Sequence, residues 1–243
     1  MTILDVGNSK KLLQQTSDFK VKILNNQLYK PIARQVQCEE RKGGFKSCGR
    51  YCVIGGFGGV GQIIVKYLLK EYNAKIVVVG RKTLDYYNDV LQDLQKLGDI
   101  EYHVCDISKK EDLEYLFSNN LFGEKKFDGL LFMAAEYKSG FLSNYSLSEF
   151  EHEEHNMYSR YRMFFEYDIS SYFSNVLIFT SIQAIHANPG SAIYAAESCF
   201  KACIHKYIRL NPRIKSYVFM YTCFKTTFGR IYCRSWVGMY SLN

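Results

Sequence analysis

The sequence has no long hydrophobic run and no dense block of basic residues in its 243 positions. Its longest apolar stretches, IVVV, LLFMAA and VLIF, fall far short of the roughly 18–20 residues that span a bilayer, and the polar start MTILDVGNSKK lacks the pattern of a signal peptide. We therefore expect no membrane association and a cytoplasmic protein. The net charge of +7 is scattered along the chain, which predicts no nucleic-acid partner.

Metal-binding patterns are also lacking. The eight cysteines are irregularly spaced. Their closest groupings, Cys48 with Cys52 and Cys199 with Cys203 and His205, do not have the paired two-residue spacing of a zinc site. The acidic and imidazole groups of EFEHEEH, residues 149–155, have no second cluster to complete a coordination sphere, so we expect a solvent-facing helix surface there. The interpretation includes no metal.

From Arg50 onward, β-type runs alternate with helix-length segments. Apolar residues make up 47% of the chain and charged residues 23%, which excludes a disordered protein. Strands separated by helices form βαβ units, and continuous apolar strands indicate a parallel sheet that is buried on both faces. The predicted fold class is α/β, a Rossmann-like doubly wound parallel sheet with helices on both faces. Strands are expected at 51–54, 75–79, 100–105, 129–134, 175–180 and 216–222, and helices from about 60, near 85–97, near 111–117, from about 147 and after 194.

The beginning of the chain does not follow this alternation. Residues 19–35 alternate only weakly between apolar and polar side chains, and ERKGGFKSCG, residues 40–49, is typical of a linker. We therefore expect a lead-in and linker over 1–47 and one main domain over 48–243.

A glycine-rich turn joins the first expected strand to the first helix. In VIGGFGGVGQ, a pyrophosphate would lie on the free N–H groups at the helix start, while glycines permit the tight turn and the close approach of the backbone. The spacing of Gly55, Gly59 and Gly61 resembles the pattern of short-chain dehydrogenases/reductases. The predicted pyrophosphate-binding residues are Gly55, Gly56, Gly58, Gly59, Val60 and Gly61.

The ends of the next strands indicate which dinucleotide would bind. An acidic residue after the second strand would hold a ribose diol, but this chain has Arg81 and Lys82, which suit a 2′-phosphate. The cofactor predicted is NADPH. Asp106, followed by Ile107, ends the third strand and resembles the adenine-contacting aspartate of the same family.

Reduction of a carbonyl group needs a hydroxyl that gives a proton to the oxygen as hydride arrives. Tyr194 is the candidate general acid, and Ser181, thirteen residues earlier at a strand end, would hold the substrate oxygen. This spacing resembles the Ser–Tyr pair of the short-chain reductases. A phenol has an ordinary pKa of about 10, so the tyrosine would need help to act near neutral pH.

A closer resemblance is to the ketoreductase domains of modular polyketide synthases and animal-type fatty acid synthases, and it covers roughly residues 18–240. It is carried by YCVIGGFGGVGQIIVKYLLKEYNAKIVVVGRK, by NVLIFTSIQAIHANPGSAIYAAESCF, by the lead-in FKVKILNNQLYKPIAR and by SWVGM. The resemblance implies reduction of a β-ketoacyl thioester on a phosphopantetheine arm by NADPH. It also implies an acyl carrier protein and other synthase domains as partners.

The chain departs from this family at several positions. Ser198 stands where a synthase ketoreductase has Asn, and Asn156, or Met157 after a one-residue slip, stands in the helix that should supply a lysine. After the fourth strand, Ala134 and Ala135 match the segment that meets the nicotinamide, but Glu136 replaces its glycine.

The sequence also ends shortly after SWVGM, before the expected substrate lid, so the main domain is expected to be short at its C-terminal end. Three hypotheses remain. The first is an active ketoreductase that uses Ser181, Tyr194 and Asn156. The second is a catalytically inactive scaffold or synthase fragment. The third is a free-standing reductase of small carbonyl compounds.

Overall fold

A computed structural model of the chain describes residues 22–24, 27–29, 44–118, 126–136, 138, 140–185, 188–221, 225–227 and 230–232. The chain divides into two units, 1–42 and 43–243. In the first unit, β1 (Lys22–Leu24) pairs antiparallel with β2 (Gln27–Tyr29). Most of the lead-in and all of SWVGM lie outside the described residues.

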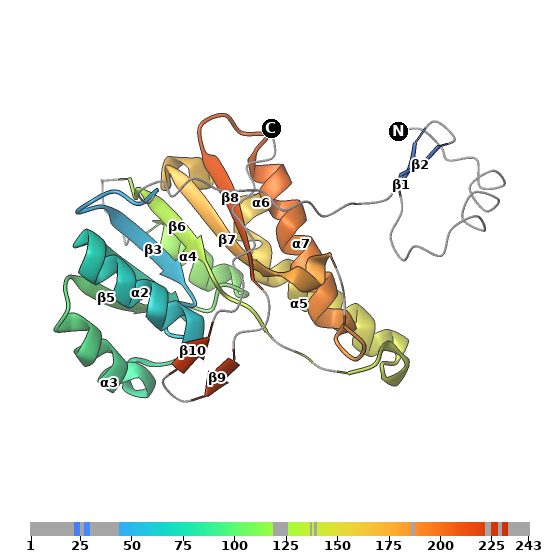
Figure 1. The fold of residues 1–243 in the computed structure, drawn as a ribbon, viewed down its shortest axis with the longest axis horizontal. Coiled ribbons are helices and arrows are strands. Elements are labelled where there is room, and N and C mark those ends of the chain that lie inside the picture. The colour runs from blue at the N-terminus through green and yellow to red at the C-terminus, as the bar shows by residue number, and fades with distance from the viewer. Residues whose placement is uncertain are drawn as a thin grey trace. The chain divides into compact units, whose positions relative to one another are not determined.

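The second unit is built around a sheet of six parallel strands (Figure 1). Their order across the sheet is β5-β4-β3-β6-β7-β8, which is the doubly wound arrangement that the sequence predicts. A separate antiparallel pair follows, β9 (Lys225–Thr227) with β10 (Arg230–Tyr232). The strands of the main sheet are β3 (Arg50–Ile54), β4 (Lys75–Gly80), β5 (Ile100–Val104), β6 (Gly129–Phe132), β7 (Asn175–Ser181) and β8 (Lys215–Tyr221).

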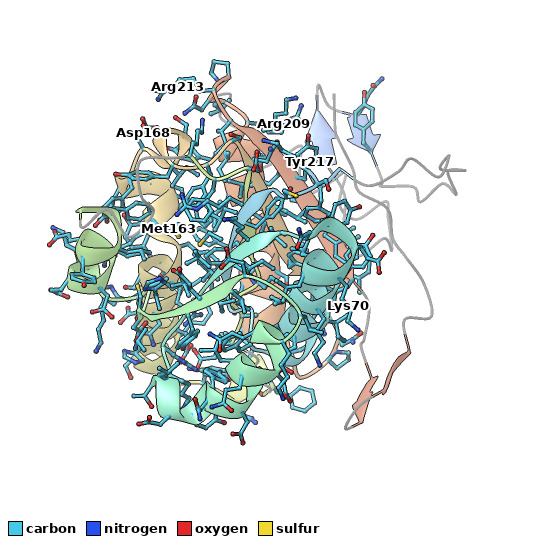
Figure 2. All side chains as sticks on the ribbon, turned by 90° about the vertical axis from the view of Figure 1, so that its left-hand side faces the viewer. Lys70, Met163, Asp168, Arg209, Arg213 and Tyr217 are labelled. Carbon is cyan, nitrogen blue, oxygen red and sulfur yellow. The ribbon has the colours of Figure 1, made fainter. Side chains whose placement is uncertain are left out.

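Helices cover both faces of this sheet. Alternate side chains of a strand point to opposite faces, and they enter two different hydrophobic clusters. In β3, Tyr51 and Val53 pack with α2 and α3, whereas Cys52 and Ile54 belong to the cluster that includes α4, α6 and α7. Figure 2 shows the side chains that fill these layers, with Met163 buried and Lys70 at the surface. The α-helices are α2 (Gly59–Tyr72), α3 (Leu84–Gln95), α4 (Lys110–Ser118), α5 (Leu147–Tyr161), α6 (Met163–Glu166) and α7 (Ala192–Ile208).

Helix α5 begins with a capping box and carries the acidic segment. The Ser146 side chain accepts a hydrogen bond from the Glu149 N–H, and the Glu149 carboxylate accepts one from the Ser146 N–H. The expectation of a solvent-facing surface over 149–155 is wrong for Glu153, which is 8% exposed. An ion pair with Lys138, from the loop after β6, compensates the burial of this carboxylate.

Within the described ranges, no helix is long and apolar enough to cross a bilayer. The same residues contain no cluster of three His, Cys, Asp or Glu side chains that could hold a metal ion.

Candidate functional site

The glycine turn lies at the carboxyl end of β3, beside the loop that leaves β6. Gly55 has a φ of +81°, and a Cβ atom there would lie 2.9 Å from the Ala134 nitrogen. A Cβ at Gly61 would lie 2.5 Å from the Gly56 oxygen. Both positions therefore bring backbone against backbone in a way that a side chain would prevent. Because α2 begins at Gly59, the N–H groups of residues 59–61 have no partner within the helix.

Phe57 anchors this turn to the sheet. Its buried ring stacks on Tyr102 with 4.9 Å between centroids and meets Tyr87 edge-on at 5.1 Å. The Gln62 side-chain amide donates a 2.9 Å hydrogen bond to the Phe57 carbonyl. The glycine-rich backbone is thus fixed by aromatic packing on one side and by α2 on the other.

A hollow of about 160 Å³ opens at the turn. It lies where the strand order reverses between β3 and β6, the switch point at which doubly wound sheets bind ligands. Bare backbone at the start of α2 fits the pyrophosphate of a dinucleotide. The lining residues are Gly55, Gly58, Gly59, Val60, Gly61, Met133, Phe179 and Tyr221.

The candidates for the adenine half lie on the β4 and β5 side of the switch point. Arg81 and Lys82 follow β4 and are exposed, and the Lys82 carbonyl accepts a 2.6 Å hydrogen bond from the Tyr102 hydroxyl. Asp106 follows β5, and its Oδ1 accepts hydrogen bonds from the backbone N–H and the hydroxyl of Ser108. The Ile107 side chain is buried in the core, so its backbone is the part that a cofactor could reach.

Ser181 and Tyr194 are both neighbours of a third residue, Tyr221, at the carboxyl ends of β7 and β8. Ser181, the last residue of β7, is opposite Tyr221 in the β7–β8 register. Burial and then a side-chain hydrogen bond with Tyr194 raise the pKa of Tyr221. Because Tyr221 also lines the hollow at the glycine turn, it contacts both parts of the candidate site.

Hydrogen bonds hold the segment between Ser181 and Tyr194. The Gln183 N–H donates to the Ser181 Oγ at 3.2 Å, and the Ser191 hydroxyl donates to the Gln183 Oε1 at 2.6 Å. The Gly140 N–H donates to the Gly190 carbonyl at 2.7 Å, which joins the loop after β6 to the turn before α7. Ser181, at the end of β7, is therefore followed by a loop that these hydrogen bonds hold, and its Oγ is an acceptor of one of them.

Asn156 lies half-buried on α5, one turn from Glu153 and one turn from Arg160. Met157 packs against the hydrophobic core, so the side chain on the polar side of the helix is that of Asn156. Glu136, in the position of the expected glycine, accepts a 3.2 Å hydrogen bond from Arg160. This carboxylate is thus compensated by an arginine one turn beyond Asn156.

Sequence reasoning missed a buried ionic cluster under the loop after β6. Glu197 is 1% exposed and Lys201 3% exposed, and both lie on α7. Glu197 accepts a 2.5 Å hydrogen bond from the Tyr161 hydroxyl and lies 3.6 Å from the Arg160 Nε, while the Lys201 ammonium donates to the Ala134 carbonyl at 2.7 Å. An acid and a lysine four residues apart on an otherwise apolar helix face were the available signal.

Ser198, which replaces the expected asparagine, is also buried on α7. Its hydroxyl donates to the Tyr194 carbonyl at 2.8 Å, and its own carbonyl accepts from the Thr180 hydroxyl at 2.9 Å. Ser198 therefore ties α7 to the end of β7 and uses its hydroxyl within the helix.

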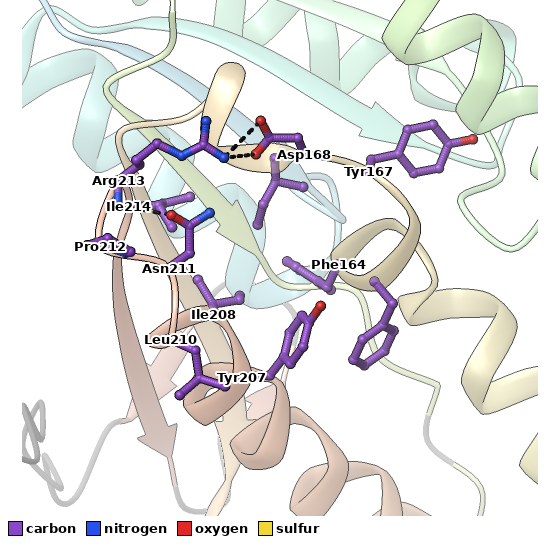
Figure 3. A pocket seen from close by; sticks show the side chains of 12 residues that line it. Phe164, Tyr167, Asp168, Tyr207, Ile208, Leu210, Asn211, Pro212, Arg213 and Ile214 are labelled. Atoms are coloured by element: carbon purple, nitrogen blue, oxygen red, sulfur yellow. Dashed lines mark hydrogen bonds and ion pairs between the residues drawn. The ribbon is translucent and has the colours of Figure 1, made fainter.

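A larger hollow, of about 590 Å³, opens between α6, the end of α7 and the start of β8 (Figure 3). The Arg213 guanidinium donates to both carboxylate oxygens of Asp168 at 3.1 Å, so these two charges of its wall are paired with each other. Since β8 starts at Lys215, this hollow lies at the amino ends of the strands, on the edge opposite the glycine turn.

Comparison with known proteins identifies the class to which this site belongs. The model of the KR domain family matches residues 49–213. The chain therefore belongs to the KR domain family, the ketoreductase domains within the short-chain dehydrogenase/reductase superfamily. That superfamily comprises oxidoreductases that use a nicotinamide cofactor.

Particular relatives are parts of much larger enzymes. The polyketide synthase PksN of Bacillus subtilis is 28% identical over 162 residues, which is 65% of this chain and 3% of PksN. PksM of the same organism is 30% identical over 98 residues, 40% of this chain and 2% of PksM. The chain thus spans a very small part of these relatives.

Solved structures share the fold at low sequence identity. A ketoreductase domain from the bacillaene assembly line has a TM-score of 0.70 at 15% identity, covering 96% of this chain and 58% of the other. An alcohol dehydrogenase from the archaeon Thermococcus sibiricus, in complex with 5-hydroxy-NADP, has a TM-score of 0.62 at 19% identity, covering 74% and 79%.

Proposed function

We propose that this domain reduces a β-ketoacyl thioester to a β-hydroxyacyl thioester with NADPH. The proposal rests on one observation: the glycine turn and the residues Ser181 and Tyr194 lie together at the carboxyl ends of the strands. The glycine turn and the Ser181–Tyr194 pair both contact Tyr221, which lines the hollow at the β3–β6 switch point. A cofactor on the turn and a proton donor beside it are what carbonyl reduction requires.

The residues that would hold NADPH lie on both sides of the β3–β6 switch point. The N–H groups of 59–61 would bind the pyrophosphate, and Arg81 would pair with the 2′-phosphate on the β4 side. Asp106 would lie near the adenine, and the backbone of Ala134 and Ala135 would border the nicotinamide half on the β6 side. When bound, NADPH supplies the hydride that reduces the carbonyl carbon.

The protein supplies the proton and holds the oxygen. The Ser181 Oγ accepts from the Gln183 N–H, and its own proton would donate a hydrogen bond to the substrate carbonyl. Tyr194 donates its phenolic proton to that oxygen as negative charge develops on it. Tyr221, hydrogen-bonded with Tyr194, stabilises the phenolate that remains. Asn156 would support this pair from α5.

The substrate class rests on the relatives, which are polyketide synthases. We propose that the acyl chain is presented as a thioester on the phosphopantetheine arm of an acyl carrier protein, with other synthase domains as partners. A free-standing reductase of small carbonyl compounds would instead accept a simple ketone.

One observation favours an inactive scaffold as a second candidate. Charged side chains occupy the loop after β6, where Glu136 pairs with Arg160, and the Ser198 hydroxyl is used within α7. A domain with this arrangement could bind the cofactor and stabilise a synthase without turnover.

The test is to mix the protein with NADPH and either a β-ketoacyl pantetheine thioester or a simple ketone, and to follow NADPH absorbance. Oxidation with the thioester alone supports the proposed function. Oxidation with the ketone as well supports the small-carbonyl reductase. NADPH binding with no oxidation of either substrate supports the scaffold, and absence of NADPH binding rejects both reductase hypotheses.

A further inference from the structure

Lys201 is a buried lysine that the proposed chemistry does not use. The residue is 3% exposed, and its ammonium donates a 2.7 Å hydrogen bond to the Ala134 carbonyl. Burying a charge is costly unless it is paired. Here Glu197, one turn earlier on α7, attracts it, and the Tyr161 ring of α5 lies 6.0 Å away. The lysine is therefore held in one place by charge, a carbonyl and an aromatic ring.

The Ala134 carbonyl, which accepts the hydrogen bond from Lys201, lies in the loop after β6, beside the glycine turn. The Ala134 nitrogen is the atom that a Cβ at Gly55 would approach to 2.9 Å. Ala134 thus touches the glycine turn through its nitrogen and α7 through its oxygen. With the adenine half bound over β4 and β5, the nicotinamide half of a dinucleotide would extend past Ala134 toward β6–β8.

Lys201 and Tyr194 share α7, and two further contacts hold this helix and the turn before it. The Ser198 carbonyl accepts from Thr180 at the end of β7, and the Gly190 carbonyl accepts from the Gly140 N–H after β6. Lys201 adds the direct link from α7 to Ala134. This link sets how far the tyrosine-bearing helix stands from the backbone along which the nicotinamide would lie.

We propose that Lys201 is a positioning residue for the nicotinamide half of the cofactor, acting through the Ala134 carbonyl, an inference that rests on the proposed function. It does not contact the reacting atoms. Its role is to hold Ala134 in place on one side and the helix of Tyr194 on the other.

Comparing the binding affinities of two ligands tests this role without a measurement of turnover. NADPH and 2′-phospho-ADP-ribose share the adenine half and the pyrophosphate, but the second lacks nicotinamide. Loss of one charge-assisted hydrogen bond in Lys201→Met should weaken NADPH binding about 10-fold or more. The affinity for 2′-phospho-ADP-ribose should stay within about twofold. Lys206→Met, an exposed lysine of the same helix, is the matched control and should change neither affinity.

The pH dependence supplies a readout that a merely structural role would not give. Burial lowers the pKa of Lys201 to about 8, opposed by Glu197 and assisted by Arg160. The charged and titratable groups around it are Glu197 on α7 and Arg160 and Tyr161 on α5, and burial holds the pKa of Tyr161 well above its ordinary value. Wild-type preference for NADPH over the fragment should therefore decline as pH rises through about 8, and Lys201→Met should show no such step.

A double variant guards against a folding defect. Lys201→Met with Glu197→Gln removes both charges, so no unpaired charge of this pair is left in the core. It should fold and should still show the selective loss for NADPH. Equal affinities of wild type, single and double variant for NADPH overturn the inference while leaving the proposed function intact. If wild type binds neither ligand, the proposed function fails, and the inference fails with it.

Discussion

The two sides of the candidate site, one on β3–β5 and the other on β6–β8, are built from different kinds of groups. On the β3–β5 side, the site consists of bare backbone at the glycine turn and exposed cations at Arg81 and Lys82. On the β6–β8 side, it rests on buried ionised groups, with Glu197 and Lys201 inside α7. The first half depends on geometry that glycine alone permits, whereas the second depends on charges that must compensate each other. Substitutions on the β3–β5 side should therefore change mainly cofactor affinity, whereas substitutions of the buried charges on the β6–β8 side should also change the free energy of unfolding.

The largest effect is expected at the reacting oxygen. Tyr194→Phe should lower the rate of thioester reduction by about a hundred- to ten-thousand-fold, because the general acid is lost. NADPH affinity should change little, since the hydroxyl acts on the substrate. Steady-state rates and cofactor titration measure the two quantities. Tyr207→Phe, an exposed tyrosine of the same helix, is the control. A variant that retains wild-type rate would remove Tyr194 from the mechanism.

The next effect is on stability and belongs to the β6–β8 side. Glu197→Gln leaves the cations of Arg160 and Lys201 without their buried carboxylate. Breaking a buried ion pair commonly costs about 3–5 kcal/mol in the free energy of unfolding. Urea denaturation measures it, with the exposed Glu154→Gln of α5 as control. A loss no larger than that of the control would mean that the cluster contributes no more than a surface pair.

A smaller effect is expected on the β3–β5 side. Arg81→Ala removes the partner proposed for the 2′-phosphate, so NADPH affinity should fall by about 1.5–3 kcal/mol, or one to two decades. NADH affinity should stay unchanged, and so should the free energy of unfolding, because Arg81 is exposed. Fluorescence titration with both cofactors measures the preference. Arg213→Ala serves as control, because the Arg213 guanidinium pairs with Asp168 at the amino ends of the strands, away from the glycine turn. Equal wild-type affinities for the two cofactors contradict the assignment.

The smallest effect is a pH dependence of stability. Burial lowers the pKa of Lys201 to about 8, and unfolding restores it toward 10.5. Above pH 8 the unfolded chain therefore binds more protons than the folded chain, so wild type gains stability relative to Lys201→Met as pH rises. At no more than about 1.4 kcal/mol per pH unit, the gain between pH 8 and about 9.5 is roughly 1–2 kcal/mol. Parallel stability curves for the two proteins would show that Lys201 is not buried as a cation.

The fold could be predicted from the sequence because six apolar strands alternate with helical segments along the chain. All six strands of the sheet lie where the alternation places them, and α2 starts at Gly59, within one residue of the expected start. The glycine turn could be located for the same reason, since its spacing is imposed by the local backbone. The assignments of Ser181, Tyr194, Asn156 and the cofactor residues remain predictions.

The buried cluster could not be found in this way. Whether Glu197 and Lys201 face solvent or core depends on how α7 packs on β7 and β8 and against α5, which no local pattern encodes. The same is true of Glu153, which lies in a run that is otherwise exposed. Tyr221 was expected as a strand residue, but its contact with both the hollow and Tyr194 follows from the register between β7 and β8.

The anchoring of Phe57 between Tyr87 and Tyr102 has a kinetic consequence. A free glycine-rich segment would lose much conformational entropy on capturing a ligand, and association would be slowed by the search for the bound shape. Here folding has already met that entropic cost, because the aromatic ring fixes the turn before any ligand arrives. We therefore expect dinucleotide capture in a single bimolecular phase. Phe57→Ala should add a slow unimolecular phase to stopped-flow traces and should lower the affinity mainly through the association rate.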